Sequence, residues 1–477
     1  MAGVRVTGDL SHLRIVGLAN LVKSHVAHEN VVIDFSSPNI AKRFHIGNLR
    51  STLIGNFLTK MLRTTGNCTT SVNYLGDCGT QIALISTYWQ RMRPSDQYWN
   101  SVPDSEKIRM YTDCYIAANR QREVDENLRD EVRQKYRLME EAITRGDFEA
   151  DCLETWRDMS TISQRHLSDF YRIFRIEFDR WMKESAEIAS ARSLIESLER
   201  EYGSVHGVLT LPSAHGPMVL CKRDRTTLYL IRELASLLHR DEIFNATRYL
   251  YVVDRAQRNH FLQLKELAER IGRADLSDKV EHVIRGTADA VDDILESGRE
   301  AARECIQASP TRRLTDKSEE DRVVNELAVS SLFVSELRRS WTSDYEFSWR
   351  NTFNASHNNG LLLHSKYSRL CSLEESNPDI MQTINDAELY TEDVGAEVAA
   401  RMTALPGLIL SSVEKRNSHD YVNGLLALAR SSGKALSVLR IRRGGRNSAK
   451  RLALFSLARK TLEEGMILMG ITPIRKM

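Results

Sequence analysis

The sequence lacks clustered metal ligands and long hydrophobic runs. Its seven cysteines are scattered from Cys68 to Cys371 without a Cys-x-x-Cys pair. This pattern argues against a structural zinc site or a disulfide framework, and it suits a reducing compartment. No apolar run approaches the roughly 20 residues that a membrane-spanning helix needs. The first thirty residues mix acidic and basic side chains, which makes a poor transit peptide. We expect no protein-held metal and no membrane segment.

A strong charge of either sign is also absent. The chain has 66 Lys and Arg residues against 64 Asp and Glu residues, a formal net charge of +2. Any polyanionic partner must therefore be met by local basic patches, because the average field is weak. With 477 residues, 42% apolar and 27% charged, the composition is that of a globular protein with two or three domains.

The first half of the chain predicts a doubly wound, Rossmann-like α/β sheet with a helical insertion. A buried strand over 31–35, a helix over 49–62 and a strand over 69–74 open the pattern. The stretch from about 88 to 181 is charged and helical, as expected for an insertion into the sheet domain. Further predicted elements are strands at 207–211, 218–221 and 249–253 and a helix at 227–239.

The second half predicts only helices. After about Glu319 the pattern is helical, and the last helix is the clearest. Its apolar face consists of Leu452, Phe455, Leu462, Met466 and Met469, and Gly470 ends it. We expect a lead-in over 1–30, an α/β domain over 31–355 and an all-α bundle over 356–477.

The segment from Ser36 to Thr52 carries the first cluster of chemistry, between the first strand and the first helix. Ligands bind at the carboxyl ends of strands in such sheets, and a helix N-terminus there offers N–H groups to an anion. Lys42 and His45 could donate to phosphate oxygens, and Gly47 leaves room for a flat base. A surface loop with a helix-capping motif is the alternative interpretation.

This segment resembles the first signature, or HIGH element, of class I aminoacyl-tRNA synthetases. The run S-S-P-N-I-A-K-R-F-H-I-G-N-L-R-S-T is similar to that of the arginyl-tRNA synthetases in particular. The run from Asn73 to Gln81 resembles that family's next block, with Cys78 where a tryptophan is usual. Asn48 stands where the second histidine of the HIGH element is expected.

A second cluster lies between Thr226 and Glu233. Tyr229 and Glu233 are four residues apart, hence on one face of a helix, where a ring and a carboxylate could clamp a guanidinium group. An ordinary pair on a solvated helix face is the alternative. The block resembles the family's T-x-L-Y-x-x-R-D, whose Tyr and Asp hold the arginine substrate, and Glu233 replaces the Asp.

The resemblance implies further substrate contacts. Residues 251–261 resemble the block that carries a substrate-binding glutamine, here Gln257. Residues 178–185 resemble the end of the helical insertion and imply Glu184 as a second carboxylate for the guanidinium. Ser37 and Asn39 are further expected arginine-binding residues, and Asn39 and Gln257 are expected to orient the amino acid.

The second class I signature, the KMSKS-type loop, is not recognisable. It should follow residues 279–283, yet the chain passes through 284–288 directly into a predicted helix at 291–304. In this family a lysine just before the HIGH element is thought to compensate for a degenerate loop, and Lys42 occupies that place.

The C-terminal region carries a basic stretch that either binds phosphates or forms a solvated face. Its candidate tRNA-binding residues are Arg440, Arg442, Arg443, Arg446 and Lys450. Residues 351–372 and 451–477 resemble the junction and the ending of the family's anticodon-binding domain.

Together these motifs imply an arginine–tRNA ligase of the mitochondrial type. Its expected partners are L-arginine, ATP with Mg²⁺, and tRNA(Arg), and it is expected to be a monomer. By family likeness it is expected in the mitochondrial matrix, with the cytoplasm as the alternative. The shortened loop and Asn48 leave open a synthetase-derived protein that binds tRNA without activating arginine. A nucleotidyltransferase on the same fold is the third interpretation, but it would not need Tyr229, Glu233 and Glu184.

Overall fold

The computed structural model describes most of the chain, with gaps in the helical half. The described residues are 10–23, 28–286, 294–307, 316–344, 347–348, 352–353, 359–385, 387–442, 445 and 447–477. The chain divides into two compact units. The sheet unit comprises 30–44 and 70–284, and the helical unit comprises 1–29, 45–69 and 285–477.

A five-stranded sheet with the strand order β3-β2-β1-β6-β7 organises the sheet unit. Its strands are β1 (Asn30–Asp34), β2 (Cys68–Leu75), β3 (Arg180–Lys183), β6 (Arg248–Asp254) and β7 (Val280–Arg285). β1 pairs in parallel with β6, and β2 pairs in parallel with β3. The predicted parallel sheet is confirmed. The strand order changes direction between β1 and β6, the place where ligands bind in such sheets.

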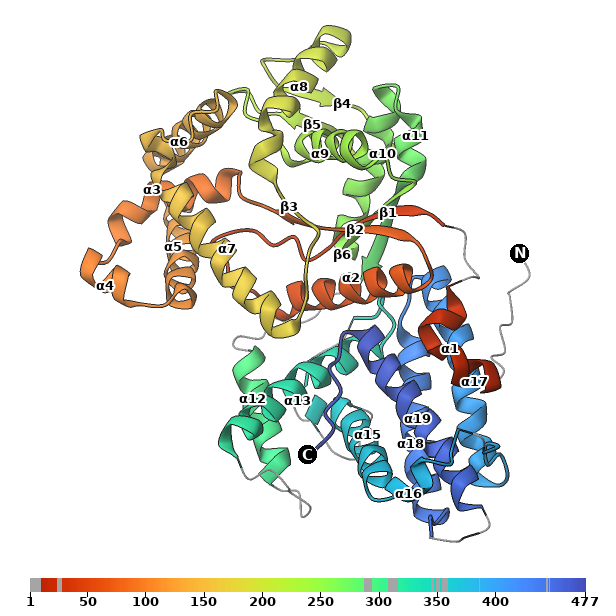
Figure 1. Cartoon of the computed structure of the whole chain (residues 1–477). Coiled ribbons are helices and arrows are strands. Elements are labelled where there is room, and N and C mark those ends of the chain that lie inside the picture. The colour runs from red at the N-terminus through yellow and green to blue at the C-terminus, as the bar shows by residue number, and fades with distance from the viewer. Residues whose placement is uncertain are drawn as a thin grey trace. The chain divides into compact units, whose positions relative to one another are not determined.

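The predicted helical insertion is present between β2 and β3 (Figure 1). It consists of α3 (Thr80–Met92), α4 (Asp96–Ser101), α5 (Asp104–Val124), α6 (Glu126–Thr144) and α7 (Glu154–Phe174). The first helix begins at Thr80, earlier than the predicted start near 88. Sequence analysis did not identify β3 as a strand, because its four residues are partly exposed and show no apolar alternation.

The strands predicted at 207–211 and 218–221 exist but do not join the main sheet. They are β4 (Leu209–Leu211) and β5 (Met218–Cys221), an antiparallel pair of their own. α8 (Ile188–Tyr202), α9 (Tyr229–Phe244), α10 (Arg258–Arg270) and α11 (Ala274–Lys279) complete the unit. Leu209, Leu234 and Tyr249 belong to one buried core cluster, so the strand pair, α9 and the main sheet pack together.

The described part of the helical unit contains no strand of its own beyond the ends of β2 and β7. Its helices are α1 (Leu10–Val22), α2 (Ile46–Thr64), α12 (Ile294–Gln307), α13 (Lys317–Leu337), α15 (Gly360–Glu375), α16 (Pro378–Met381), α17 (Val394–Lys415), α18 (His419–Val438) and α19 (Ser448–Met469). All five residues of the predicted apolar face of α19 are buried. Gly470 ends this helix in the left-handed region, with φ of 92°.

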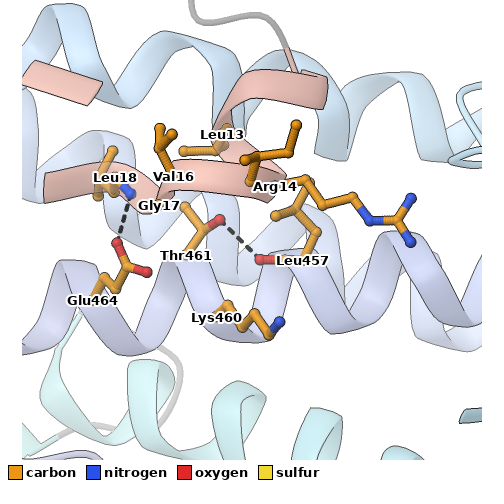
Figure 2. Close-up of a pocket in the computed structure, with 10 residues that line it drawn as sticks. Leu13, Arg14, Val16, Gly17, Leu18, Leu457, Lys460, Thr461 and Glu464 are labelled. Atoms are coloured by element: carbon orange, nitrogen blue, oxygen red, sulfur yellow. Dashed lines mark hydrogen bonds between the residues drawn. The ribbon is translucent and has the colours of Figure 1, made fainter. Parts of the chain in front are cut away.

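α1 is kinked and docks on α19 (Figure 2). Gly17 has φ of 77°, which interrupts the helix and frees the next N–H groups. The carboxylate of Glu464 accepts from Leu18 N at 2.6 Å and so caps the second half of α1. A cavity of about 200 Å³ lies beside this contact, and Arg14 and Lys460 are among its lining residues. The N-terminal helix is therefore anchored to the C-terminal helix within this unit.

Two expectations about composition can be compared with the structure. All seven cysteines are free in the structure. In the described parts of the chain, no helix is long and apolar enough to cross a bilayer.

Candidate active site

The loop after β1 is built tightly against the end of β2. Ser37, at φ of 40°, donates from Oγ to Asp34 Oδ1 at 2.5 Å and accepts from Tyr74 N at 3.0 Å. Gly76 lies so close that a Cβ there would stand 2.1 Å from Asn39 Oδ1. Asn39 itself is exposed at this edge of the sheet. The structure thus gives Ser37 a role inside the loop and leaves Asn39 accessible.

Tyr229 begins α9 and Glu233 lies one turn later on the same face of the helix, as their spacing predicted. Tyr229 is 42% exposed, whereas Glu233 is 2% exposed. Glu233 Oε1 has no hydrogen-bond partner among the described residues. Burial raises the pKa of Glu233 to about 7, although the positive charge of Arg240 opposes the shift. A buried carboxylate with an unused oxygen therefore lies beneath an accessible aromatic ring.

Glu184 lies at the carboxyl end of β3 and is 5% exposed. Its Oε1 accepts from Nε of Arg232 at 2.7 Å. Arg232 belongs to the same helical turn as Tyr229 and Glu233. Glu184 is therefore buried next to α9, but one of its oxygens is already bound by a guanidinium group of the chain.

Asp34 and Arg240 form a second buried ion pair, which sequence analysis missed. Arg240 Nη2 lies 2.6 Å from Asp34 Oδ2, and Arg240 Nη1 lies 3.9 Å from Glu233 Oε1. The guanidinium group also lies over the rings of Tyr74 and Tyr251, at 4.8 and 5.3 Å from their centroids. The sequence gives little signal for this pair, because Arg240 stands between His239 and Asp241 as a solvated residue would.

Gln257 and His260 lie at the end of β6, where α10 begins. Gln257 Oε1 is buried and has no hydrogen-bond partner within the described chain. The His260 ring stacks at 4.5 Å from the Tyr229 ring. Burial, and then the charge of His282, lower the pKa of His260 to about 4, so His260 is neutral near pH 7. The structure therefore brings Gln257 to the same sheet edge as the start of α9.

Buried acidic side chains gather around two buried guanidinium groups. Four of these carboxylates, Asp34, Glu140, Glu184 and Glu233, lie around Arg232 and Arg240. A third guanidinium group, Arg192, is 26% exposed and reaches Glu140 at 3.3 Å. Glu233 is the carboxylate with the weakest pairing, because its contact with Arg240 is long and shared. The arrangement suits a bound cation.

His45, Gly47 and Asn48 belong to the helical unit. α2 begins at Ile46, so Gly47 and Asn48 lie in its first turn rather than in the loop, contrary to the predicted start at 49. His45 Nδ1 accepts from Gly47 N at 3.1 Å, and Asn48 Oδ1 accepts from His45 N at 3.4 Å. This capping box explains the earlier start of the helix. The His45 ring also covers Gly47, since a Cβ there would stand 2.9 Å from Cε1.

Lys42 belongs to the sheet unit and is exposed. Its Nζ lies 5.3 Å from the centre of the Tyr115 ring in the insertion helix α5. The surrounding protein desolvates the ammonium group and lowers the pKa of Lys42. Lys42 is therefore an exposed ammonium group held over an aromatic ring near the end of the first loop.

Sequence analysis also missed Arg50, which is 0% exposed in α2. Its guanidinium group donates to four backbone carbonyl oxygens, those of Gly286, Ser340, Trp341 and Ser343. Arg50 Nε lies 3.8 Å from the buried Glu336 carboxylate. Arg50 therefore ties α2 to the residues just after β7 and to the segment after α13.

The C-terminal basic residues differ in their surroundings. Arg440 and Arg442 are exposed in the connection before α19. Lys450, inside α19, forms an ion pair with Glu388 at 2.6 Å. The predicted residues Arg443 and Arg446 lie outside the described residues.

Comparison with known proteins identifies the family. A parallel sheet with a helical insertion, followed by a helical bundle, is the layout of a class I aminoacyl-tRNA synthetase. Residues 15–349 match the family model described as tRNA synthetases class I (R), catalytic domain. Residues 363–477 match the DALR anticodon binding domain. The chain therefore belongs to the arginyl-tRNA synthetase family.

Individual relatives agree with this assignment. A protein of Mus musculus named probable arginine–tRNA ligase, mitochondrial, is 26% identical over 97% of this chain and 81% of its own length. The arginine–tRNA ligase of Encephalitozoon cuniculi is 27% identical over 94% of this chain and 80% of its own length. The fold is similar to that of arginyl-tRNA synthetase from Plasmodium falciparum, with a TM-score of 0.75 and 24% identity over 95% of this chain and 78% of that one.

Proposed function

We propose that this chain is an arginine–tRNA ligase, which activates L-arginine with ATP and transfers it to tRNA(Arg). The observation that carries the proposal is Glu233, a buried carboxylate with an unpartnered oxygen, one turn below the exposed ring of Tyr229. Family membership supports the activity, and the cluster of buried carboxylates at the carboxyl edge of the sheet supports a cationic amino acid as substrate. The comparisons lend no support to the alternative of a protein that only binds tRNA.

In the proposed site, Tyr229 and Glu233 receive the guanidinium group of arginine. The ring offers its π face and the carboxylate offers an acceptor pair. Glu184 contributes negative charge, although Arg232 binds one of its oxygens at 2.7 Å. Lysine would be rejected, because its ammonium group cannot match the planar fork of a guanidinium group.

The remaining predicted residues would orient the amino acid and the nucleotide. Asn39 and Gln257 are proposed to hold the main-chain end of arginine, and Gln257 has a buried oxygen ready to accept. Ser37, whose hydroxyl group donates to Asp34, is proposed to support the arginine site from this loop.

The first proposed step joins the arginine carboxylate to the α-phosphate of ATP. One carboxylate oxygen attacks the α-phosphorus, the bond to the bridging oxygen breaks, and pyrophosphate leaves. Lys42, His45 and Asn48, with the N–H groups around Gly47, are proposed to stabilise the charge that develops on the phosphate. The 2′-hydroxyl of the terminal adenosine of the tRNA then attacks the carbonyl carbon, and AMP leaves.

Mg²⁺ is proposed to arrive with ATP and to share the charge of its phosphates. The described residues gather no group of three carboxylate, histidine or cysteine side chains that could hold a metal ion. No step of the proposed reaction depends on a metal site built by the protein.

The helical unit is proposed to bind the tRNA. The match of 363–477 to an anticodon-binding domain supports this role, and we propose a boundary near residue 355. Arg440, Arg442, Arg443, Arg446 and Lys450 are the proposed phosphate contacts. We also propose a monomer acting in the mitochondrial matrix, a location suggested by the names of mitochondrial relatives.

The test is aminoacylation of tRNA(Arg) with labelled arginine, together with arginine-dependent exchange of pyrophosphate into ATP in the presence of that tRNA. We expect both activities. Binding of tRNA(Arg) without either activity would overturn the proposal and favour the binding-only protein.

A further inference from the structure

Glu140 is a buried carboxylate that the proposed reaction does not use. It lies on the insertion helix α6 and is 0% exposed. Glu140 occupies the apolar face of this helix, with Val132 and Tyr136 preceding it at helical spacing. A buried charge at that position is costly unless it is paired, so the residues that pair with Glu140 show what it does.

The partners of Glu140 lie at the start of α9. Both of its oxygens accept from Thr227 N at 3.1 Å, and Oε1 also accepts from the Thr227 hydroxyl group. Tyr136 OH donates to Oε1 at 2.9 Å, and Arg192 Nη2 donates to Oε2 at 3.3 Å. These donors match what an ionised carboxylate needs. Glu140 thereby fixes the residue that lies two positions before Tyr229.

The network continues from Thr227 to the carboxylates of the proposed arginine site. Arg232 Nη1 donates to Thr227 O at 2.6 Å, to Thr227 Oγ1 at 2.9 Å and to Tyr136 OH at 3.1 Å. The same guanidinium group then donates from Nε to Glu184 at 2.7 Å. Each residue of this network is at most 5% exposed, so water cannot take the place of these hydrogen bonds.

We propose that Glu140 is a positioning residue for arginine recognition. It orients Glu184 through Thr227 and Arg232, and it fixes the N-terminal turn of α9 that carries Tyr229 and Glu233. This inference rests on the proposed function. It extends that function, because the helical insertion would then contribute to amino-acid specificity.

The test is calorimetric binding of L-arginine and, separately, of ATP to the full chain and its variants. Glu140→Gln keeps the shape but removes the charge, and we expect arginine to bind about 10-fold more weakly, with ATP binding unchanged. Glu141→Gln is the matched control, because Glu141 is the next residue, its side chain is 37% exposed and its ion pair is an exposed one with Arg137, at 3.6 Å. We expect this control to bind arginine like the parent chain.

A milder variant keeps the test decisive if Glu140→Gln does not fold. Tyr136→Phe removes only the hydroxyl group between Glu140 and Arg232. We expect about 3-fold weaker arginine binding, as for one lost hydrogen bond.

The outcomes separate this inference from the proposed function. An arginine affinity within twofold of the parent in folded Glu140→Gln, or in Tyr136→Phe if the first variant fails, overturns the inference alone. Equal weakening of arginine and ATP binding would show a merely structural role and overturns it too. A parent chain that binds no arginine overturns both proposals.

Discussion

Arg240 Nη2 lies 2.6 Å from Oδ2 of Asp34, with both side chains buried. The chain thus neutralises the carboxylate at the end of β1 with one of its own guanidinium groups. Arg232 does the same for one oxygen of Glu184. Glu233 Oε1 makes no hydrogen bond and lies 3.9 Å from Arg240 Nη1, which makes Glu233 the carboxylate best suited to a substrate cation.

The first prediction concerns this carboxylate. We expect Glu233→Ala to raise the KM for arginine at least 10-fold, since a charged hydrogen-bond partner is lost. The KM for ATP should change little. Steady-state pyrophosphate exchange measures both constants, and an unchanged KM for arginine would remove Glu233 from the site.

The second prediction concerns pH. The pKa of Glu233 is raised to about 7, above its value in the unfolded chain, so the folded state binds the extra proton. Its contribution to stability is therefore largest at low pH and is lost as the pH rises through about 7. Arginine needs the ionised carboxylate, so its affinity should change in the opposite direction.

Below pH 7 we expect the affinity for arginine to fall by up to about 10-fold for each pH unit, as for one linked proton. Calorimetry between pH 5.5 and 8.5 measures this slope. Glu233→Gln is the control and should lose the slope. The same slope in parent and variant would assign the titration to another group.

The third prediction tests the close approach of two loops. A Cβ on Gly76 would stand 2.1 Å from Asn39 Oδ1, so Gly76→Ala should destabilise the fold and impair activation of arginine. The clash is with the Asn39 side chain, so adding Asn39→Ala should recover part of the lost stability. Thermal unfolding of the single and double variants measures the recovery. A double variant no more stable than Gly76→Ala would point to strain elsewhere.

The fourth prediction concerns Arg50. Arg50→Met leaves four carbonyl oxygens without this donor and removes a cation that lies 3.8 Å from the buried Glu336 carboxylate. We expect a loss of about 3–5 kcal/mol in the free energy of unfolding, as for breaking a buried ion pair. Arg401→Gln is the control, with a side chain 50% exposed, and should cost less than about 1 kcal/mol. Urea unfolding compares them.

The fifth prediction concerns tRNA. Arg440 and Arg442 are exposed, whereas Lys450 is paired with Glu388. We expect Arg440→Gln with Arg442→Gln to weaken tRNA binding and to reduce its dependence on salt, by about one unit of slope for each lost phosphate contact. Lys450→Gln should have a smaller effect. Filter binding at several salt concentrations measures the slopes. An unchanged slope in the double variant would favour the alternative that the basic stretch is a solvated face that does not contact phosphates.

Much of the fold could be predicted, because its signals are local. The apolar run at 31–35 and the periodicity of 452–469 each specify one element, and both are present as β1 and α19. β3 could not be found, because four partly exposed residues carry no period and depend on pairing with β2.

The site was predictable only where it follows a motif or a helical spacing. Tyr229 and Glu233 share a helical turn, so spacing alone placed them together. The pairing of Asp34 with Arg240 and of Glu140 with Thr227 joins residues far apart in the chain, and only the folded sheet and insertion bring them together. The sequence signal for the pairing of Glu140 with Thr227 was an acidic residue at a position on the apolar face of α6.

The most direct test of the account is pyrophosphate exchange in the presence of tRNA(Arg), comparing arginine with citrulline. Citrulline has the same shape as arginine but carries a neutral urea in place of the guanidinium cation. We expect at least about 100-fold lower kcat/KM with citrulline, because the buried carboxylates would lose their cation. Equal exchange with both amino acids would contradict the claim that Glu233 and its neighbours recognise positive charge.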